Sequence, residues 1–69
     1  MNLGMYTIFD RVAGSYSDIK LFQNKDLASR WFEHFKSESP FAQDLQLFFL
    51  GVYDLTTGKI EAVVPGFIG

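Results

Sequence analysis

Residues 45–53 restrict the fold more than any other segment, because they are apolar on both sides of any strand that they could form. Successive side chains of a β-strand point to opposite faces of the sheet. One face of this strand would carry Leu45, Leu47, Phe49, Gly51 and Tyr53, and the other would carry Phe48, Leu50 and Val52 behind Gln46. A strand of this kind must be covered on both faces. A short chain with one expected helix provides one cover, so the pattern predicts a second subunit or a partner on the other face.

Length and composition predict a single folded domain and narrow the classes of function. A chain of 69 residues without cysteine forms one domain, residues 1–69, near the lower size limit for folding alone. An aromatic content of 17% argues against disorder. A chain with a net charge of −2 does not attract the phosphate backbone of DNA, so binding to DNA would require a local basic patch. With no apolar run of about 20 residues and no recognisable signal peptide, we expect a cytosolic protein without membrane contact.

The residue pattern predicts an α+β domain, a four-stranded antiparallel sheet with one helix packed on one face. The expected order is β-β-α-β-β, and the third strand then lies beside the first, giving the spatial order 2-1-3-4. The strands are expected at 5–11, 16–22, 45–53 and 59–64. The helix follows an N-cap at Asn24 and ends before Pro40. Its apolar stripe is expected to place Trp31 and Phe35 against Ile8 or Leu47.

Several residues at strand ends have structural interpretations. Asp10 and Asp54 each follow an aromatic residue at the end of a strand, and we expect their carboxylates to close Asx-type turns. Gly58 is expected in a left-handed conformation, and Gly51 is expected to mark a bulge or a close approach of two backbones. The return strand should stop at Pro65, and the apolar tail after it should be either mobile or docked on a partner.

The sequence contains no motif that carries catalysis or binds a cofactor. His34 is the one histidine, and the chain has no cysteine, so the sequence lacks the set of ligands that a typical metal site requires. No glycine-rich phosphate loop and no nucleophile elbow is present. We therefore expect a protein that is not an enzyme and that has no metal and no cofactor.

Aromatic rings near basic residues on the first predicted hairpin form the one candidate binding site. Sheet aromatics can stack on the bases of single-stranded nucleic acid. The candidates are Arg11 and Lys20, with Tyr6 or Tyr16 as the exposed ring. The alternative interpretation assigns the strand aromatics to the core and to a dimer contact. In that case Phe48, Leu50 and Val52 would form the interface between two copies of the chain.

A series of motifs gives the chain a family resemblance. The blocks are Tyr6-x-Ile8-Phe9-Asp10 with Ala13 and Tyr16, then Ala28-Ser29-Arg30-Trp31-Phe32, Ser39-Pro40-Phe41, Asp44 through Leu50-Gly51-Val52-Tyr53-Asp54, and Thr57-Gly58-Lys59-Ile60-Glu61. In this order they resemble the small nonstructural protein of gokushovirus-type (Microviridae) single-stranded DNA phages. The proline that this family carries before the residue at Phe22 is absent here.

The resemblance implies a phage-encoded protein that is absent from the virion and acts in the host cytoplasm. It also implies an association with the synthesis or packaging of single-stranded viral DNA, and it brings no catalytic residue. We therefore expect a nonenzymatic accessory protein, a homodimer that contacts single-stranded DNA. The alternative is a homodimeric protein-interaction module that binds a host or phage replication protein.

Overall fold

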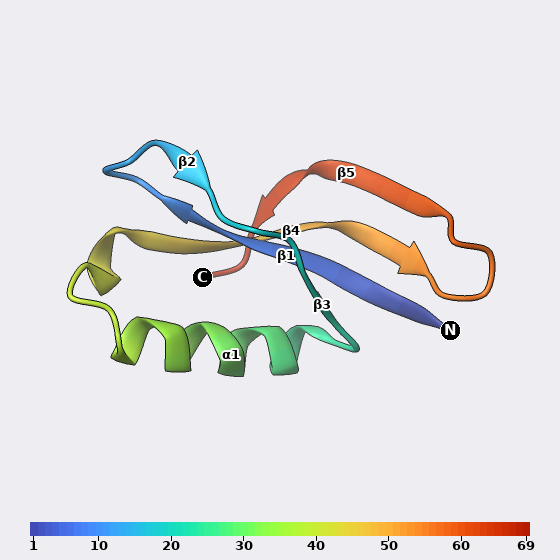
Figure 1. The fold of residues 1–69 in the computed structure, drawn as a ribbon, viewed down its shortest axis with the longest axis horizontal. Helices are drawn as coiled ribbons and strands as arrows, with labels where there is room; N and C mark the ends of the chain where they lie inside the picture. The colour runs from blue at the N-terminus through green and yellow to red at the C-terminus, as the bar shows by residue number, and fades with distance from the viewer.

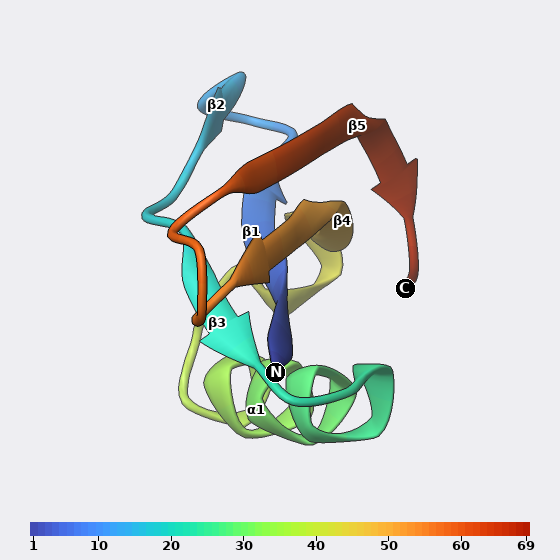
Figure 2. The same ribbon diagram turned by 90° about the vertical axis from the view of Figure 1, so that its right-hand side faces the viewer.

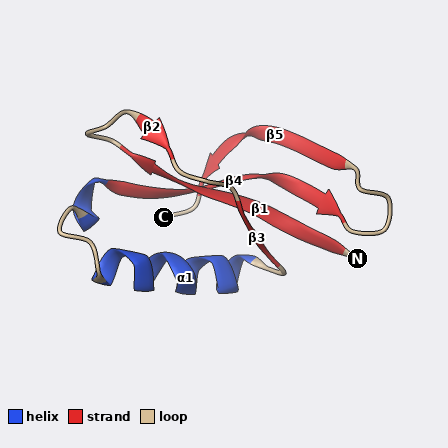
Figure 3. Ribbon diagram, in the orientation of Figure 1, coloured by secondary structure: helices blue, strands red, loops and turns tan.

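A computed structural model describes residues 1–69 as one curled antiparallel sheet with one long helix (Figure 1). The elements are β1 (Asn2–Asp10), β2 (Ser15–Tyr16), β3 (Lys20–Phe22), α1 (Lys25–Ser37), the 3-10 helix η1 (Ala42–Asp44), β4 (Leu45–Asp54) and β5 (Ile60–Phe67). The strand order is β2-β1-β4-β5, and β3 also pairs with β1. Figure 3 shows the strands and α1 as separate layers. The predicted α+β class and strand order are confirmed.

The antiparallel pair β1 and β4 forms the centre of the sheet. The pairing of the two strands begins with Asn2 opposite Asp54 and ends with Asp10 opposite Leu45. On one face of this pair, Ile8 and Leu47 are buried beneath α1. Figure 2 shows α1 on that side, while β2 and β5 rise on the opposite side. The face of the sheet turned away from α1 is called the open face below.

The helix has the predicted bounds and the predicted N-cap. The Oδ1 atom of Asn24 accepts a hydrogen bond from the backbone N–H of Leu27 at 2.9 Å, which satisfies one of the free donors of the first turn. Asp26 in the first turn and Lys36 in the last turn complement the helix dipole. The helix ends at Ser37, three residues before Pro40.

A different part of the apolar stripe faces the sheet than the sequence predicts. Ala28 and Phe32 are fully buried, whereas the prediction that Phe35 faces the sheet is wrong, because its side chain is 42% exposed. Trp31 lies at the margin of the core, with its ring centroid 5.4 Å from that of Phe22. The small side chain of Ala28 allows the helix backbone to approach the sheet closely. The edge of the stripe that contains Ala28 and Phe32 therefore lies deepest.

The predicted strand 16–22 is divided into β2 and β3 by a break after Tyr16. Ser17 donates its N–H to the carbonyl oxygen of Ile8 at 2.8 Å, but the N–H of Ile8 donates to the Ser17 hydroxyl at 3.1 Å. The Ser17 carbonyl oxygen instead accepts from the hydroxyl of the buried Thr7 at 2.9 Å. A side chain thus replaces a backbone acceptor in the ladder, and the regular pairing stops at that point.

Two five-residue turns share one pattern of hydrogen bonds. The Oδ1 atom of Asp54 accepts from the N–H groups of Thr56 at 2.8 Å and Thr57 at 3.3 Å. Gly58, with φ 75°, donates its N–H to the Asp54 carbonyl oxygen at 2.8 Å. The turn at residues 10–14 repeats this arrangement with its own aspartate and glycine. The predicted turn roles of both aspartates and of Gly58 are confirmed.

The turn at Asp54 predicts a loss of stability in acid. The N–H of Thr56 holds the pKa of the Asp54 carboxyl below its ordinary value of 3.8, because the hydrogen bond favours the charged form. Because the folded-state pKa is lower than the unfolded-state pKa, the charged carboxylate stabilises the fold at pH values above the unfolded-state pKa. This stabilisation is lost as the pH falls through the folded-state pKa. Asp54→Asn should therefore flatten the fall of the urea midpoint between roughly pH 5 and pH 2. The control is Asp18→Asn, which should follow the wild type; identical profiles for all three proteins would contradict the prediction.

The C-terminal part of the chain pairs with β4 beyond the predicted stop. Pro65 lies in a bulge of β5 between Ala62, which is opposite Gly51, and Gly66, which is opposite Phe49. Because Pro65 is not paired with a residue of β4, its missing N–H leaves no acceptor on β4 without a donor. Ile68 donates its N–H to the carbonyl oxygen of Leu47 at 2.8 Å and packs against the core. The prediction of a tail that is mobile or docked on a partner is wrong, because the tail docks on its own sheet.

Candidate functional site

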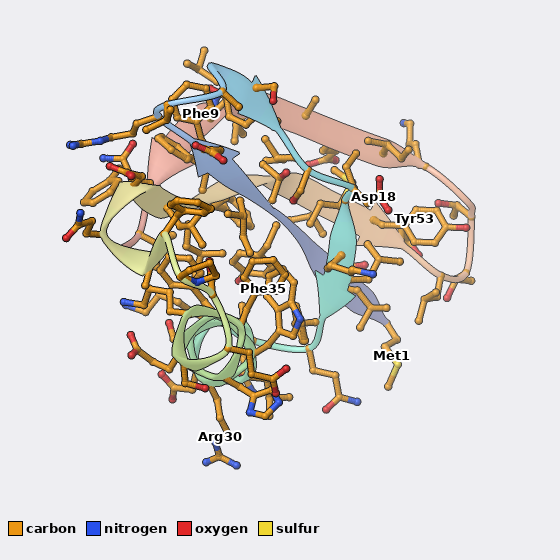
Figure 4. The ribbon with its side chains drawn as sticks, turned by 60° about the vertical axis from the view of Figure 1, so that its left-hand side comes forward. Met1, Phe9, Asp18, Arg30, Phe35 and Tyr53 are labelled. Carbon is orange, nitrogen blue, oxygen red and sulfur yellow. The ribbon has the colours of Figure 1, made fainter.

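Four aromatic rings, one from each of β1, β2, β4 and β5, form a continuous cluster on the open face. These residues, Phe9, Tyr16, Phe48 and Phe67, are called the aromatic cluster below. The ring centroids lie 4.7 Å apart for Phe9 and Tyr16, 6.2 Å for Phe9 and Phe48, and 5.8 Å for Phe48 and Phe67. Figure 4 shows Phe9 on the far side of the sheet from α1.

The strand register builds this cluster. Tyr16 lies directly opposite Phe9, and Phe67 lies directly opposite Phe48. Residues that face each other across antiparallel strands project their side chains to the same face, and these centroid distances are typical of tilted aromatic pairs. The outer two rings, Tyr16 and Phe67, remain more than half exposed. The cluster therefore presents ring surface to solvent instead of closing into a core.

A groove of about 290 Å³ adjoins the aromatic cluster. It lies between the β2–β3 segment and β5, which rise on the same side of the sheet (Figure 2). Its lining is Thr7, Tyr16, Ser17, Ile19, Leu50 and Pro65. Tyr16 belongs to both the groove and the cluster, so the two form one surface.

A β-bulge at Leu50 divides the residues that were predicted to form a dimer interface. Phe48 and Leu50 lie on the open face, but Val52 is opposite Gly4. A side chain at Gly4 would point at the ring of Tyr6, 2.7 Å away, and Tyr6 lies on the helix side. Val52 therefore lies on the helix side as well. Its assignment to one surface with Phe48 and Leu50 is wrong, because the extra residue of a bulge reverses the alternation.

Gly51 is the residue that makes this bulge possible. Its φ of 136° falls in the region that favours glycine, and a Cβ atom there would collide with the carbonyl oxygen of Glu61. The predictions of a bulge and of a close backbone approach at Gly51 are both confirmed.

Tyr6 does not belong to the open face. Its side chain is only 4% exposed, and its ring lies 5.4 Å from Phe49 and 6.0 Å from Phe22 on the helix side. Burial raises the pKa of the phenol. The prediction of Tyr6 as an exposed stacking ring is wrong, because the alternation of β1 turns residues 6 and 8 to the core and residues 7 and 9 to the open face.

Charged side chains lie around the open face, but none belongs to the aromatic cluster or the groove. Arg11 follows β1 two residues after Phe9, and its side chain is exposed, with its guanidinium 3.9 Å from the carboxylate of Asp44. The Asp44 side chain is only 19% exposed, but 3.9 Å is a long separation for an ion pair and the guanidinium faces solvent, so Arg11 is available to another anion. Lys20 is exposed on β3, opposite Tyr6. Of the four predicted nucleic-acid residues, only Tyr16 presents its ring on this surface.

Sequence reasoning missed Phe9 and Phe67 as site residues, and it assigned Phe48 to a dimer interface and not to a site shared with Tyr16. Phe9 and Phe48 occupy open-face positions of the two central strands, and their shared face could have been found from the alternation alone. Phe67 could not have been found in this way, because it falls in the segment after Pro65 that was predicted to lie outside the sheet.

No group of three or more His, Cys, Asp or Glu residues lies close enough together to hold a metal ion. His34 contacts Glu38, the C-cap residue of α1 one turn later, with Nε2 and Oε1 2.8 Å apart.

At 13 residues, α1 is too short to span a bilayer. The chemistry that the open face offers is stacking and apolar contact.

The chain was compared with protein families, with curated proteins and with solved structures. A family described as Phage ORF5 protein matches residues 3–69, which is nearly the whole chain. Neither the curated proteins nor the solved structures gave a match. The family match includes all of the strands except the first residue of β1, together with the helix and the whole aromatic cluster. The chain therefore belongs to the Phage ORF5 protein family and is a phage protein.

Proposed function

We propose that this phage protein is a nonenzymatic, nonstructural accessory protein of a gokushovirus-type phage. It associates with single-stranded viral DNA during synthesis or packaging in the host cytoplasm. The observation that carries the proposal is the aromatic cluster, four adjoining rings on a sheet face that no element covers. The family membership and the resemblance to proteins of single-stranded DNA phages support the phage setting.

Stacking on the aromatic cluster suits single-stranded DNA without sequence preference. Every base has a π-face, and unpaired bases can lie on aromatic rings, while paired bases inside a duplex cannot. Tyr16 and Phe67 offer the most accessible rings. Arg11, near one end of the cluster, can neutralise a phosphate. Because so few cations adjoin this face, the affinity should fall only shallowly with salt, with a log–log slope of about −1 for one or two phosphate contacts.

A titration of a labelled oligothymidylate, followed by fluorescence anisotropy, tests the proposal. Tyr16→Ala and Phe67→Ala should each weaken binding about tenfold, since one base–ring stack contributes about 1–3 kcal/mol. The matched control is Phe41→Ala, because Phe41 is 63% exposed and Phe67 is 61% exposed, but Phe41 lies outside the sheet before η1. The control should bind like the wild type, and circular dichroism should show that all variants are folded.

Two outcomes of this titration would contradict the proposal. Phe41→Ala could weaken binding as much as Phe67→Ala, and the effect would then not depend on the aromatic cluster. The wild type could also fail to bind the oligonucleotide at about 50 mM salt, where charge contacts are strongest.

One observation favours a second candidate, a protein-interaction module that binds a host or phage replication protein. The aromatic cluster and the groove carry no charge, and the whole chain has a net charge of −2. An uncharged aromatic surface suits the core of a protein–protein interface as well as it suits bases. Absence of DNA binding at low salt, together with saturable binding of a purified replication protein that Tyr16→Ala weakens, would favour this candidate.

A further inference from the structure

We infer that the free edge of β5 pairs with β5 of a second copy of this chain and joins two sheets into a symmetric dimer. β5 is the last strand of the sheet and has β4 as its neighbour on one side only. In Figure 1, β5 forms the upper margin of the sheet, and Pro65 near its end faces the β2–β3 segment across the groove. An edge strand presents unpaired N–H and C=O groups, which another strand can satisfy.

The hydrogen bonds of the hairpin show which residues of β5 offer these groups. The N–H of Asp54 donates to the carbonyl oxygen of Lys59 at 2.9 Å, so this pair is hydrogen-bonded across the hairpin. In an antiparallel ladder, hydrogen-bonded pairs alternate with pairs whose backbone groups point outward. Glu61 therefore turns its groups to β4, whereas Ile60 and Ala62 direct theirs to the free edge.

The side chains along residues 60–64 leave this edge unprotected. Four of the five are apolar, and Val64 is 88% exposed. Edge strands are commonly protected by lysine, proline or a bulge. Here the bulge between Ala62 and Gly66, with Pro65, interrupts the second half of the stretch, so the regular free edge is residues 60–62. Glu61 is the one charged residue within the exposed stretch.

One register satisfies both the backbone and the charges. When the two-fold axis passes beside Ala62, Ala62 lies opposite Ala62 of the second copy, and Ile60 lies opposite Val64. Ile60 and Ala62 are the positions with outward backbone groups, whereas Val64 lies in the bulge, outside the regular ladder with β4. Glu61 then lies opposite Val63 of the second copy, so the two carboxylates do not face each other. A register centred on Glu61 would oppose like charges and would need the backbone groups that already bind β4.

This dimer would place two aromatic clusters on one side of a continuous sheet. The two-fold axis between antiparallel strands is perpendicular to the sheet, so both open faces point in the same direction. The dimer itself follows from the β5 edge alone. Its use as a longer platform for single-stranded DNA rests on the proposed function.

Cysteine cross-linking tests the register in the absence of DNA. The natural chain has no cysteine, so a single introduced thiol reports only on its own position. In Ala62→Cys, the two Cα atoms would lie about 5.5 Å apart, within reach of a disulfide. Oxidation should give a covalent dimer on a non-reducing gel. Glu61→Cys is the register control and should cross-link far less; equal cross-linking at both positions would overturn the register.

Sedimentation velocity tests the interface. The wild type should sediment as a dimer at tens of micromolar, and Val64→Lys should sediment as a folded monomer, because lysine on an edge opposes strand pairing. Val12→Lys is the control, since Val12 is also an exposed valine but lies in the turn after β1, and it should remain dimeric. A monomeric wild type, or a Val64→Lys variant that remains dimeric, would overturn the inference. DNA binding by a monomeric wild type would leave the proposed function standing.

Discussion

Gly51→Ala is expected to lower the free energy of unfolding by about 3 kcal/mol or more, a large part of the stability of a domain this small. Two effects add at this position. A non-glycine residue is strained at a φ of 136°, and the new Cβ atom would collide with the Glu61 carbonyl oxygen in the adjacent strand. Relief of the collision requires β4 and β5 to separate at the bulge. Urea unfolding followed by Trp31 fluorescence measures the change.

Gly58→Ala is the matched control for this substitution. Gly58 also has a positive φ, 75°, but a Cβ atom there would have nothing within 4 Å. The substitution should cost about 1–2 kcal/mol, from the left-handed conformation alone. Equal losses at Gly51 and Gly58 would show that the close approach of β4 and β5 contributes nothing, and would contradict the account of the bulge.

Phe32→Ala should cost about 3–5 kcal/mol, because it removes a large side chain from the centre of the core and leaves a cavity. Phe32 is 2% exposed and packs with Ile8, Ala28 and Leu47 between α1 and the sheet. The expected loss is comparable with the whole stability of a small domain, so the variant should be partly unfolded at room temperature. Its urea midpoint can be measured in a stabilising buffer that contains sulfate.

Phe35→Ala provides the comparison within the same helix. Because the side chain of Phe35 is 42% exposed and contacts the margin of the core through Trp31, its removal should cost a small fraction of the Phe32 value. Both substitutions change phenylalanine to alanine in one helix, so their helix propensities cancel. A larger loss for Phe35→Ala would mean that the helix faces the sheet with the side that the sequence predicts.

Features that depend on a few neighbouring residues could be predicted from the sequence. Asn24 begins the helix because a short side chain with an oxygen can cap it, and Asp54 closes its turn through neighbouring N–H groups. Gly58 adopts a positive φ that other residues resist. The strand order also follows, because two hairpins joined by one helix have few antiparallel arrangements.

Features that depend on which residues meet across two elements could not be predicted. The apolar stripe of α1 is wide, and only contact with the sheet decides that Phe32, and not Phe35, lies at its centre. The bulge at Leu50 was expected near Gly51, but its reversal of the side-chain alternation moves Val52 to the helix side. Pro65 was predicted to end the last strand, yet a second offset in β5 accommodates it and brings Phe67 beside Phe48.

The same offsets decide the composition of the candidate site. Tyr6 and Tyr16 look alike in the sequence, since each aromatic ring lies on a predicted strand near a basic residue. The alternation of β1 buries Tyr6 under α1, while pairing with Phe9 brings Tyr16 to the open face. A site whose members come from four strands therefore becomes visible only when the register of every pair is known.

Nitrogen-15 NMR of the protein, titrated with a short oligothymidylate, tests most directly whether the open face is the functional surface. The account predicts that the largest chemical-shift changes occur at the aromatic cluster, Phe9, Tyr16, Phe48 and Phe67, with a smaller change at Arg11. The outer surface of α1 should remain unchanged, including Arg30, which extends away from the sheet in Figure 4. Changes that are largest along α1, or no change at low salt, would contradict it.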